Sequence, residues 1–245
     1  MFVRGLGTAH PARRYTKADC LEAFQSSSWF GKLDRRARTI AELVLTGDNG
    51  INSRHLALES LEEVFAIDPD TLHARFIAHA PRLAADAAAK AVRDASLSLP
   101  EIDGIVVSTY TGYLCPGLSG YVIERLGLRL NIAAFDLVGH GCAAALPNWQ
   151  IADALLAARR CENVLSVCVE VSSAAMYLDN DPGVLVSACL FGDGAGAAVL
   201  SQRADTDKRS IECKAIGSLL NPVEREALRF EQRSGMLRNV LTRPV

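Results

Sequence analysis

Short apolar segments alternate with segments of helical length in the second part of the chain. Apolar and β-favouring residues fill positions 104–109, 132–138 and 163–169, and stretches typical of helices cover 118–126 and 143–160. Strands that alternate with helices of this length are typical of parallel βαβ units with right-handed crossovers. The pattern therefore predicts an α/β fold in which helices cover both faces of a parallel sheet.

The first hundred residues are predicted to be mainly helical. After a short strand at 2–6, helices are expected at 17–24, 33–45 and 69–95. Thr16 is expected to be the N-cap of the first helix, because its hydroxyl can accept a hydrogen bond from a backbone N–H of the first turn. Pro81 lies inside the last helix, where it predicts a kink or a joint between two helices.

The C-terminal part is predicted to start a second structural half. The helix at 143–160 is apolar around most of its circumference, so we expect it to be a buried central helix. Residues 201–209 are polar and charged, which indicates a linker, and 210–217 is expected to be a new strand. About 40 residues bury too little surface to form a domain of their own. The predicted division is one domain over 1–205 and the incomplete start of a second over 206–245.

Composition and charge restrict the functional class. The chain has 245 residues and a formal net charge of −2, which gives no general attraction to nucleic acid or to an anionic membrane. No apolar run approaches the roughly 18 residues of a membrane span, and the N-terminus shows no targeting signal. We therefore expect no nucleic-acid partner and no membrane insertion.

The seven cysteines are scattered along the chain without any C-x-x-C pair. This distribution argues against a disulfide framework and against a zinc site, and it favours a reducing cytoplasm as the location. No metal ion is therefore expected.

Cys142 is the leading candidate for chemistry. It follows the predicted strand at 132–138 and precedes a helical segment, with Gly139 and Gly141 allowing a sharp turn. At such an elbow, backbone N–H groups and the positive end of a helix dipole favour a thiolate. A thiolate is a nucleophile near neutral pH, so the position indicates acyl transfer through a thioester. The alternative is a buried cysteine that acts as a small, inert hydrophobic residue.

Four motifs occur in order between residues 104 and 200. They are Cys-Pro-Gly at 115–117 ahead of Arg-Leu-Gly-Leu at 125–128, Gly-His-Gly-Cys at 139–142 with its Ala-rich helix, the strand that ends at Glu170, and Leu-Phe-Gly-Asp-Gly-Ala at 190–195. As an ordered set they resemble the type III polyketide synthases, the chalcone and stilbene synthase family.

This resemblance implies a thiolase-like α/β fold of two similar βαβαβ halves, of which the chain carries the first and the start of the second. It also implies a cytoplasmic homodimer that uses coenzyme A thioesters as substrates, without a bound cofactor. In the family the cysteine, here Cys142, accepts a starter acyl group from acyl-CoA. A histidine and an asparagine in the second half then promote decarboxylative condensation with malonyl-CoA, and none of the five histidines here follows Cys142. The resemblance thus predicts an acyltransferase and leaves the activity of this chain alone open.

The resemblance also assigns positions in a substrate pocket. Phe191 matches a phenylalanine that gates the family's active site, with a core aromatic residue as the alternative. Ala175 lies where plant members often place a threonine, and its smaller side chain predicts room for a long aliphatic starter. Tyr110 and Thr111 match positions at the pocket floor, and Cys115 matches a position that reaches across the dimer. A fatty starter predicts an alkylresorcinol or an alkylpyrone as product.

Residues that bind coenzyme A are not assigned by the resemblance. The basic residues that hold its phosphates in plant members do not align here, and the candidates are Arg35, Arg36, Arg38 and Arg54, with a solvated helix face as the alternative. His140, two residues before the thiol, is either a base for Cys142 or a histidine in the wall of the site or at the dimer contact.

Two other classes of protein remain open. Positions 139–144 and 192–197 approach the G-x-G pattern of dinucleotide-binding oxidoreductases, although a strand-like Ala-Val-Leu segment follows the second. A truncated, non-catalytic half-enzyme or dimerising module also fits a chain without the family's histidine and asparagine. Within the wider superfamily, a ketoacyl synthase acting on a carrier protein is a further alternative.

Overall fold

The computed structural model describes residues 1–205 and 210–242, which form two compact units. The first, the sheet unit, comprises Met1–His10, Ile77–Glu170 and Gly194–Leu219. The second, the helical unit, comprises Pro11–Phe76, Val171–Asp193 and Leu220–Val245. The predicted domain boundary between residues 205 and 206 adjoins positions 206–209, outside the described residues, and stays a prediction.

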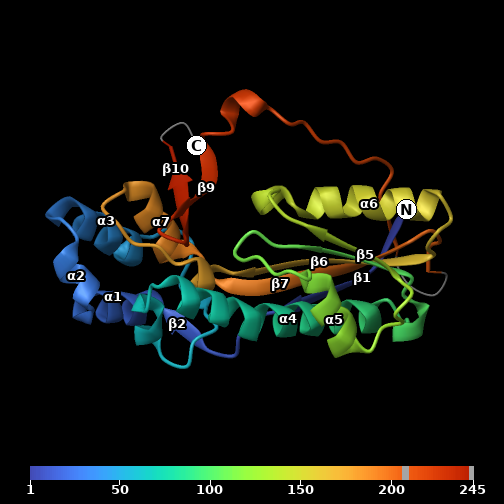
Figure 1. The fold of residues 1–245 in the computed structure, drawn as a ribbon, viewed down its shortest axis with the longest axis horizontal. Coiled ribbons are helices and arrows are strands. Elements are labelled where there is room, and N and C mark those ends of the chain that lie inside the picture. Colours follow the sequence, from blue (N-terminus) through green and yellow to red (C-terminus); the bar gives the residue numbers. More distant parts are fainter. Residues whose placement is uncertain (206–209, 243–245) are drawn as a thin grey trace. The chain divides into compact units, whose positions relative to one another are not determined.

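A six-stranded sheet forms the sheet unit, with the strand order β5-β4-β6-β7-β1-β8 (Figure 1). Its strands are β1 (Phe2–Ala9), β4 (Gly104–Ser108), β5 (Ala133–Leu137), β6 (Asn163–Val171), β7 (Asp193–Ser201) and β8 (Ile211–Glu212). β4 pairs in parallel with β5 and with β6, as the βαβ pattern predicts. β1 is antiparallel to β7 and to β8, so the sheet is mixed and not wholly parallel. The βαβ pattern does not predict this pairing, because it fixes the direction only of strands that a crossover helix joins.

Helices lie on both faces of this sheet (Figure 1). α4 (Pro69–Asp94) and α5 (Leu118–Leu126) lie on one face, and α6 (Ala145–Ala157) lies on the other. Gly5 and Gly7 allow α4 to come very close to β1. A Cβ atom at either position would overlap the helix backbone, at Ala91 or Ala87. The helix continues through Pro81, so the predicted joint between two helices is absent.

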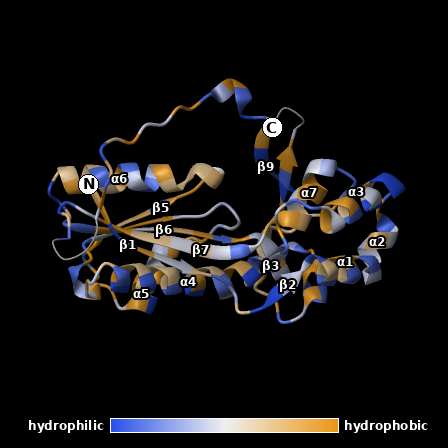
Figure 2. Ribbon diagram, turned by 180° about the vertical axis from the view of Figure 1, so that it is seen from behind, coloured by the Kyte–Doolittle hydropathy of each residue, from blue (hydrophilic) through white to orange (hydrophobic). Residues whose placement is uncertain are grey.

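α6 packs on the sheet with one face only. Leu155 and Leu156 pack with Val106 and Leu200 of the sheet. Figure 2 colours β5 and β6 of the same sheet as largely hydrophobic. Leu146 is 46% exposed, so the helix is not the fully buried central element that its apolar composition predicts. Its Gln150 amide donates to the hydroxyl of Ser218, in the segment after β8, at 3.3 Å.

Helices also dominate the helical unit, as the sequence predicts. Its elements are β2 (Arg14–Thr16), α1 (Lys17–Ser26), α2 (Ser28–Lys32), α3 (Arg35–Thr46), β3 (Ser53–His55), the 3-10 turns η1 (Leu61–Phe65), η4 (Ser172–Ala175) and η5 (Pro222–Glu224), α7 (Pro182–Leu190), β9 (Leu228–Arg233) and β10 (Met236–Leu241). Thr16 caps α1 as predicted, because its hydroxyl accepts from the Asp19 N–H at 3.2 Å while the Asp19 carboxylate accepts from the Thr16 N–H at 2.7 Å. Ala37 and Ala41 of α3 pack with Leu185 of α7 in the core.

The C-terminal segment differs from its prediction. Only β8 forms within the strand expected at 210–217, whereas β9 and β10 form an antiparallel hairpin that the sequence analysis does not predict. The hairpin turns at Ser234 and Gly235, with φ angles of 51° and 77°. Two positive φ values at a two-residue turn suit the twist of a hairpin, and Ser-Gly is a known turn signal.

Two absences hold for residues 1–205 and 210–242. No helix there is long and apolar enough to cross a bilayer. The same residues contain no group of three or more His, Cys, Asp or Glu side chains arranged to hold a metal ion.

Candidate active site

Cys142 lies at an elbow between a strand and a helix. It is the central residue of the 3-10 turn η3 (Gly141–Ala143), which follows β5 and precedes α6. Gly139 and Gly141 have φ angles of 87° and 56°, which residues with a side chain rarely adopt. The side chain of Cys142 is exposed, so the reading as a buried inert cysteine does not fit.

The carboxyl ends of three parallel strands meet near this elbow. In register, Ser108 at the end of β4 lies beside Leu137 at the end of β5 and beside Cys168 of β6. Tyr110 therefore follows β4 at the edge where Cys142 follows β5, and Glu170 lies near the end of β6. Functional groups in α/β proteins gather at this edge, because chain segments leave neighbouring parallel strands there.

Tyr110 contacts the cysteine directly. The Cys142 thiol donates to the phenol oxygen of Tyr110, with 3.9 Å between Sγ and Oη. Burial raises the pKa of Tyr110 above its usual value, and the nearby Glu170 and Cys142 raise it further. The phenol is therefore neutral at physiological pH.

Glu170 holds the loop after β4 in place. Its carboxylate accepts from the Tyr110 N–H at 3.1 Å, from the Thr111 N–H at 3.0 Å and from the Thr111 hydroxyl at 2.7 Å. The Thr109 hydroxyl adds a bond at 3.3 Å. Burial raises the pKa of Glu170 to about 7, although these hydrogen bonds to its charged form act in the opposite direction.

The elevated pKa of Glu170 predicts a measurable dependence of stability on pH. A carboxyl group with a raised folded-state pKa binds more protons in the folded than in the unfolded chain, so its contribution is complete below pH 4.5 and is lost as the pH rises through about 7. Relative to Glu170→Gln, the wild type should lose about 1.4 kcal/mol of unfolding free energy per pH unit across this window. Urea unfolding of both proteins between pH 4 and 8 measures this difference in the free energy of unfolding. If the free energies of the two proteins changed in parallel with pH, Glu170 would not titrate in this range.

A buried polar cluster fixes α6 on the sheet. The Asn148 side chain is fully buried, and its amide donates to the Ser108 hydroxyl at 3.2 Å and to the Val167 carbonyl at 3.1 Å. The Ser108 hydroxyl in turn donates to Cys168 Sγ at 3.2 Å. Burial raises the pKa of Cys168, which keeps this second thiol protonated near neutral pH. The cluster joins the start of α6 to β4 and β6 and so sets the direction of the Cys142 elbow.

The predicted site residues fall in both units. Tyr110, Thr111, Cys115 and Cys142 belong to the sheet unit, where Thr111 is buried and Cys115 is exposed in the turn before α5. Ala175, in η4, and Phe191, which follows α7, belong to the helical unit. Phe191 is 39% exposed, which does not fit the reading as a core aromatic residue.

The arginines that are candidates for binding coenzyme A differ in their exposure and in their contacts. Arg54 donates from its guanidinium to the carbonyl of Phe191 at 3.1 Å and also to the carbonyl of Ala188, so it anchors the backbone after α7. Arg35 and Arg36 are exposed, and the guanidinium of Arg38 lies over the Phe30 ring at 5.2 Å. His140 is exposed at the start of the elbow.

The Asp193 side chain is architectural. Its buried carboxylate accepts from the Ala57 N–H at 2.6 Å and from the N–H and hydroxyl of Ser173 at 2.8 and 2.6 Å. These bonds join three segments of the helical unit that are far apart in sequence. The segment after Asp193 is a strand, so the second G-x-G pattern lacks the helix that a dinucleotide phosphate requires.

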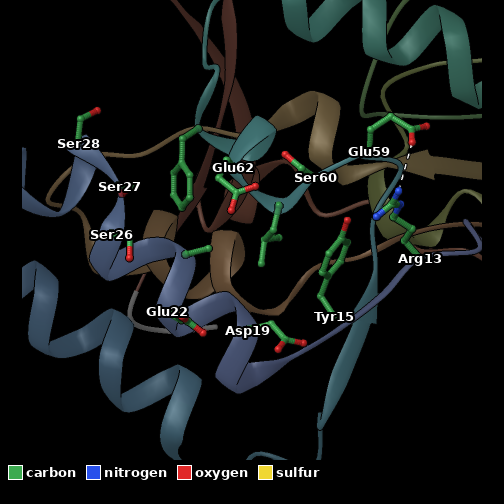
Figure 3. Close-up of a pocket in the computed structure, with 13 residues that line it drawn as sticks. Arg13, Tyr15, Asp19, Glu22, Ser26, Ser27, Ser28, Glu59, Ser60 and Glu62 are labelled. Atoms are coloured by element: carbon green, nitrogen blue, oxygen red, sulfur yellow. Dashed lines mark hydrogen bonds and ion pairs between the residues drawn. The ribbon is translucent and has the colours of Figure 1, made fainter.

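A separate cleft of about 820 Å³ lies in the helical unit between α1 and the segment before η1 (Figure 3). Its charged lining residues are Arg13, Asp19, Glu22, Glu59 and Glu62. Asp19 caps α1, and Arg13 pairs with Glu59 at 3.5 Å. The predominantly acidic lining does not complement phosphate groups, and none of the predicted site residues contributes to it.

Glu170, which the sequence marks only as the end of a strand, and Asn148 have roles at this site that the sequence does not predict. A glutamate at the end of an otherwise apolar strand is a usable signal for the first, because a charged residue is rarely placed inside such a strand without partners. Asn148 gives no comparable signal, since its partners on β4 and β6 are known only once the fold is known.

Comparison with known proteins identifies the family of the chain. Residues 13–215 match the sequence model of a family described as FAE1/type III polyketide synthase-like protein. The 3,5-dihydroxyphenylacetyl-CoA synthase of Streptomyces toyocaensis is 30% identical over 202 residues, which cover 80% of this chain and 48% of the relative. The alpha-pyrone synthesis polyketide synthase-like protein Pks18 of Mycobacterium tuberculosis is 28% identical over 207 residues, covering 81% and 51%. The chain thus spans about half the length of the curated relatives it matches.

Solved structures confirm the predicted α/β, thiolase-like fold. The 1,3,6,8-tetrahydroxynaphthalene synthase of Streptomyces coelicolor, a bacterial type III polyketide synthase, superposes with a TM-score of 0.83 at 22% identity, covering 100% of this chain and 68% of its own. PKS-I of the brown alga Ectocarpus siliculosus gives a TM-score of 0.81 at 21% identity, covering 98% and 67%.

Proposed function

Because the chain belongs to the FAE1/type III polyketide synthase-like family, we propose that Cys142 is the nucleophile of a polyketide-forming acyltransferase. The observation that carries the proposal is the geometry of Cys142. Its thiol is exposed at a glycine elbow, at the carboxyl edge of parallel strands, and a phenol lies within hydrogen-bonding distance. A nucleophile of acyl transfer needs this combination of access and a fixed direction.

The first chemical step is a thioester exchange. The Cys142 thiolate attacks the carbonyl carbon of an acyl-CoA, a tetrahedral oxyanion forms, and the coenzyme A thiolate leaves. The products are an acyl thioester on Cys142 and free coenzyme A. Backbone N–H groups at the glycine elbow are the donors available to the oxyanion in this part of the chain.

The second proposed step is condensation with malonyl-CoA. Loss of carbon dioxide from malonyl-CoA leaves an enolate, whose carbon attacks the acyl thioester, and the Cys142 thiolate is released as the new carbon–carbon bond forms. By the resemblance, a histidine and an asparagine promote this decarboxylation, and we assign that role to no residue of this chain. No cofactor is proposed, since both substrates are coenzyme A thioesters.

The proposed starter is a fatty acyl group and the proposed product an alkylresorcinol or alkylpyrone. The small side chain of Ala175 supports the proposal of a long starter. The Tyr110 ring lies beside the cysteine, and with Thr111 it is proposed to narrow the floor of the substrate pocket. Phe191, exposed after α7, is proposed as the gate. The relatives' names include an α-pyrone and a naphthalene synthase, so the product is a proposal for this chain and not a property of the family.

A cytoplasmic homodimer is proposed as the working state. β5 is an edge strand of the sheet, and Phe135 on it is 40% exposed. An exposed apolar edge strand is a surface that a second copy can cover.

Incubation with a fatty acyl-CoA alone tests the acyl-accepting role. Intact-mass spectrometry should show one acyl adduct on the wild type, none on Cys142→Ala, and an unchanged adduct on Cys213→Ala, which removes a half-buried thiol outside the proposed site. The malonyl-dependent step does not enter this measurement. Equal labelling of wild type and Cys142→Ala would contradict the role of Cys142, and no adduct on either would favour a non-catalytic dimerising module.

A further inference from the structure

The Cys142 sulfur forms a hydrogen bond with the side chain of Tyr110. The two residues come from different strand ends, since Tyr110 follows β4 and Cys142 follows β5. Their contact, with 3.9 Å between Sγ and Oη, is therefore made by the fold and not by neighbouring sequence. The resemblance assigns Tyr110 only to the pocket floor, and that role does not require its hydroxyl.

Hydrogen bonds to Glu170 fix the backbone of Tyr110. The Tyr110 N–H donates to both carboxylate oxygens, at 3.1 and 3.2 Å, and the adjacent Thr111 donates through its N–H and its hydroxyl. A carboxylate that holds two successive backbone N–H groups restricts the loop conformation and hence the direction of the ring. The phenol is therefore prearranged beside the sulfur.

The direction of the hydrogen bond must reverse when the cysteine ionises. A thiol donates to the phenol oxygen, as in the structure, whereas a thiolate can only accept. The phenol can then donate, because burial and the nearby Glu170 hold its pKa above the usual value and keep its proton in place. A hydrogen bond to an ionised acceptor is about twice as strong as one between neutral groups, so the contact favours the thiolate.

We propose that the Tyr110 hydroxyl is a further catalytic group of this site, which donates a hydrogen bond to the Cys142 thiolate and thereby stabilises the nucleophile. This inference rests on the proposed function for its role in acyl transfer. The thiol proton leaves to solvent, the phenol proton stays on its oxygen throughout, and the sulfur then forms its bond to the acyl carbon as the coenzyme A thiolate leaves. The phenol thus acts on the reacting atom without a proton transfer of its own.

The test is the pH profile of alkylation at Cys142. Wild type and Tyr110→Phe are treated with iodoacetamide between pH 6 and 10, and the rate at Cys142 is followed by peptide mass spectrometry. Phenylalanine keeps the ring and removes only the hydroxyl. We expect the midpoint of the Cys142 profile to rise by about one pH unit, which is a roughly tenfold lower rate below the midpoint.

Two controls separate this effect from a change of fold. Tyr113→Phe removes a phenol from the same loop whose side chain is 63% exposed, and it should leave the profile unchanged. The exposed Cys115 serves as an internal reference whose own profile should not move in any variant. Glu170, which faces Tyr110, and His140, two residues from the thiol, are unchanged in all of these proteins.

The outcomes distinguish this inference from the proposed function. Coincident profiles of wild type and Tyr110→Phe, within about 0.3 pH unit, would overturn the inference even if acyl-CoA labels Cys142. A shifted profile in a chain that acyl-CoA does not label would overturn the proposed function, and only the stabilisation of the Cys142 thiolate by Tyr110 would stand.

A second measurement avoids substitution of Tyr110 altogether. In protein labelled with 3-fluorotyrosine, one fluorine resonance should shift as Cys142 ionises, and this titration should be absent from Cys142→Ala. The difference between the two spectra itself identifies the Tyr110 signal. Five resonances that titrate alike in both proteins would contradict the contact.

Discussion

Replacement of Asp193 by alanine is expected to lower the free energy of unfolding by about 3–5 kcal/mol. The carboxylate is 5% exposed and accepts three hydrogen bonds, from the Ala57 N–H and from the N–H and hydroxyl of Ser173. Alanine would leave these donors buried without partners. It would also remove the negative charge that faces the buried Arg75, whose pKa burial already lowers.

Urea unfolding measures this loss, with Asp48→Ala as the matched control. Asp48 lies in the exposed loop after α3 of the same unit, so its replacement should change stability by less than about 0.5 kcal/mol. A loss below about 1 kcal/mol for Asp193→Ala would show that the three hydrogen bonds do not join these segments as the structure has them.

Replacement of Cys142 by serine is expected to lower the rate of acyl transfer by a factor on the order of a thousand. Serine keeps the size of the side chain, but its hydroxyl is not ionised near neutral pH and is therefore a much weaker nucleophile than a thiolate. The rate is measured as coenzyme A released from acyl-CoA.

Cys213→Ser is the matched control for this experiment, because it also exchanges a thiol for a hydroxyl, at a half-buried position outside the proposed site. Its rate should stay near that of the wild type. If Cys142→Ser retained a rate within tenfold of the wild type, the thiolate of Cys142 would not be the nucleophile.

Local sequence signals predict the elements whose determinants are themselves local. Leu118–Leu126 forms α5 as predicted, since an apolar helical stretch ends there at Gly127, which adopts a left-handed conformation with φ of 65°. Thr16 caps α1 because the capping box needs only residues within one turn. The elbow at Cys142 follows in the same way from the two glycines that flank His140.

Long-range pairing is what the sequence does not reveal. β1 joins the sheet beside β7, nearly the full described length away, and this pairing makes the sheet mixed. The same limit applies at the site. Glu170 acts on Tyr110 across 60 residues, and Asn148 bonds to Ser108 across 40, so neither contact leaves a pattern in the local sequence.

The exposed outer face of α6 shows a further limit of pattern reading. The apolar circumference of residues 143–160 correctly indicates a helix that packs against the sheet through Leu155 and Leu156. It does not indicate how much of that helix the described chain itself covers, because hydrophobicity records the need for burial and not the partner that provides it.

The most direct measurement of the central claim is the acyl occupancy of each of the seven cysteines after incubation with a fatty acyl-CoA. Peptide mass spectrometry gives the seven values in one experiment. The proposed function predicts that the acyl group is found on Cys142, with little on Cys115 although both thiols are exposed. Equal occupancy of Cys115 and Cys142 would contradict it, because it would show that exposure alone, and not the elbow at the end of β5, determines which thiol reacts.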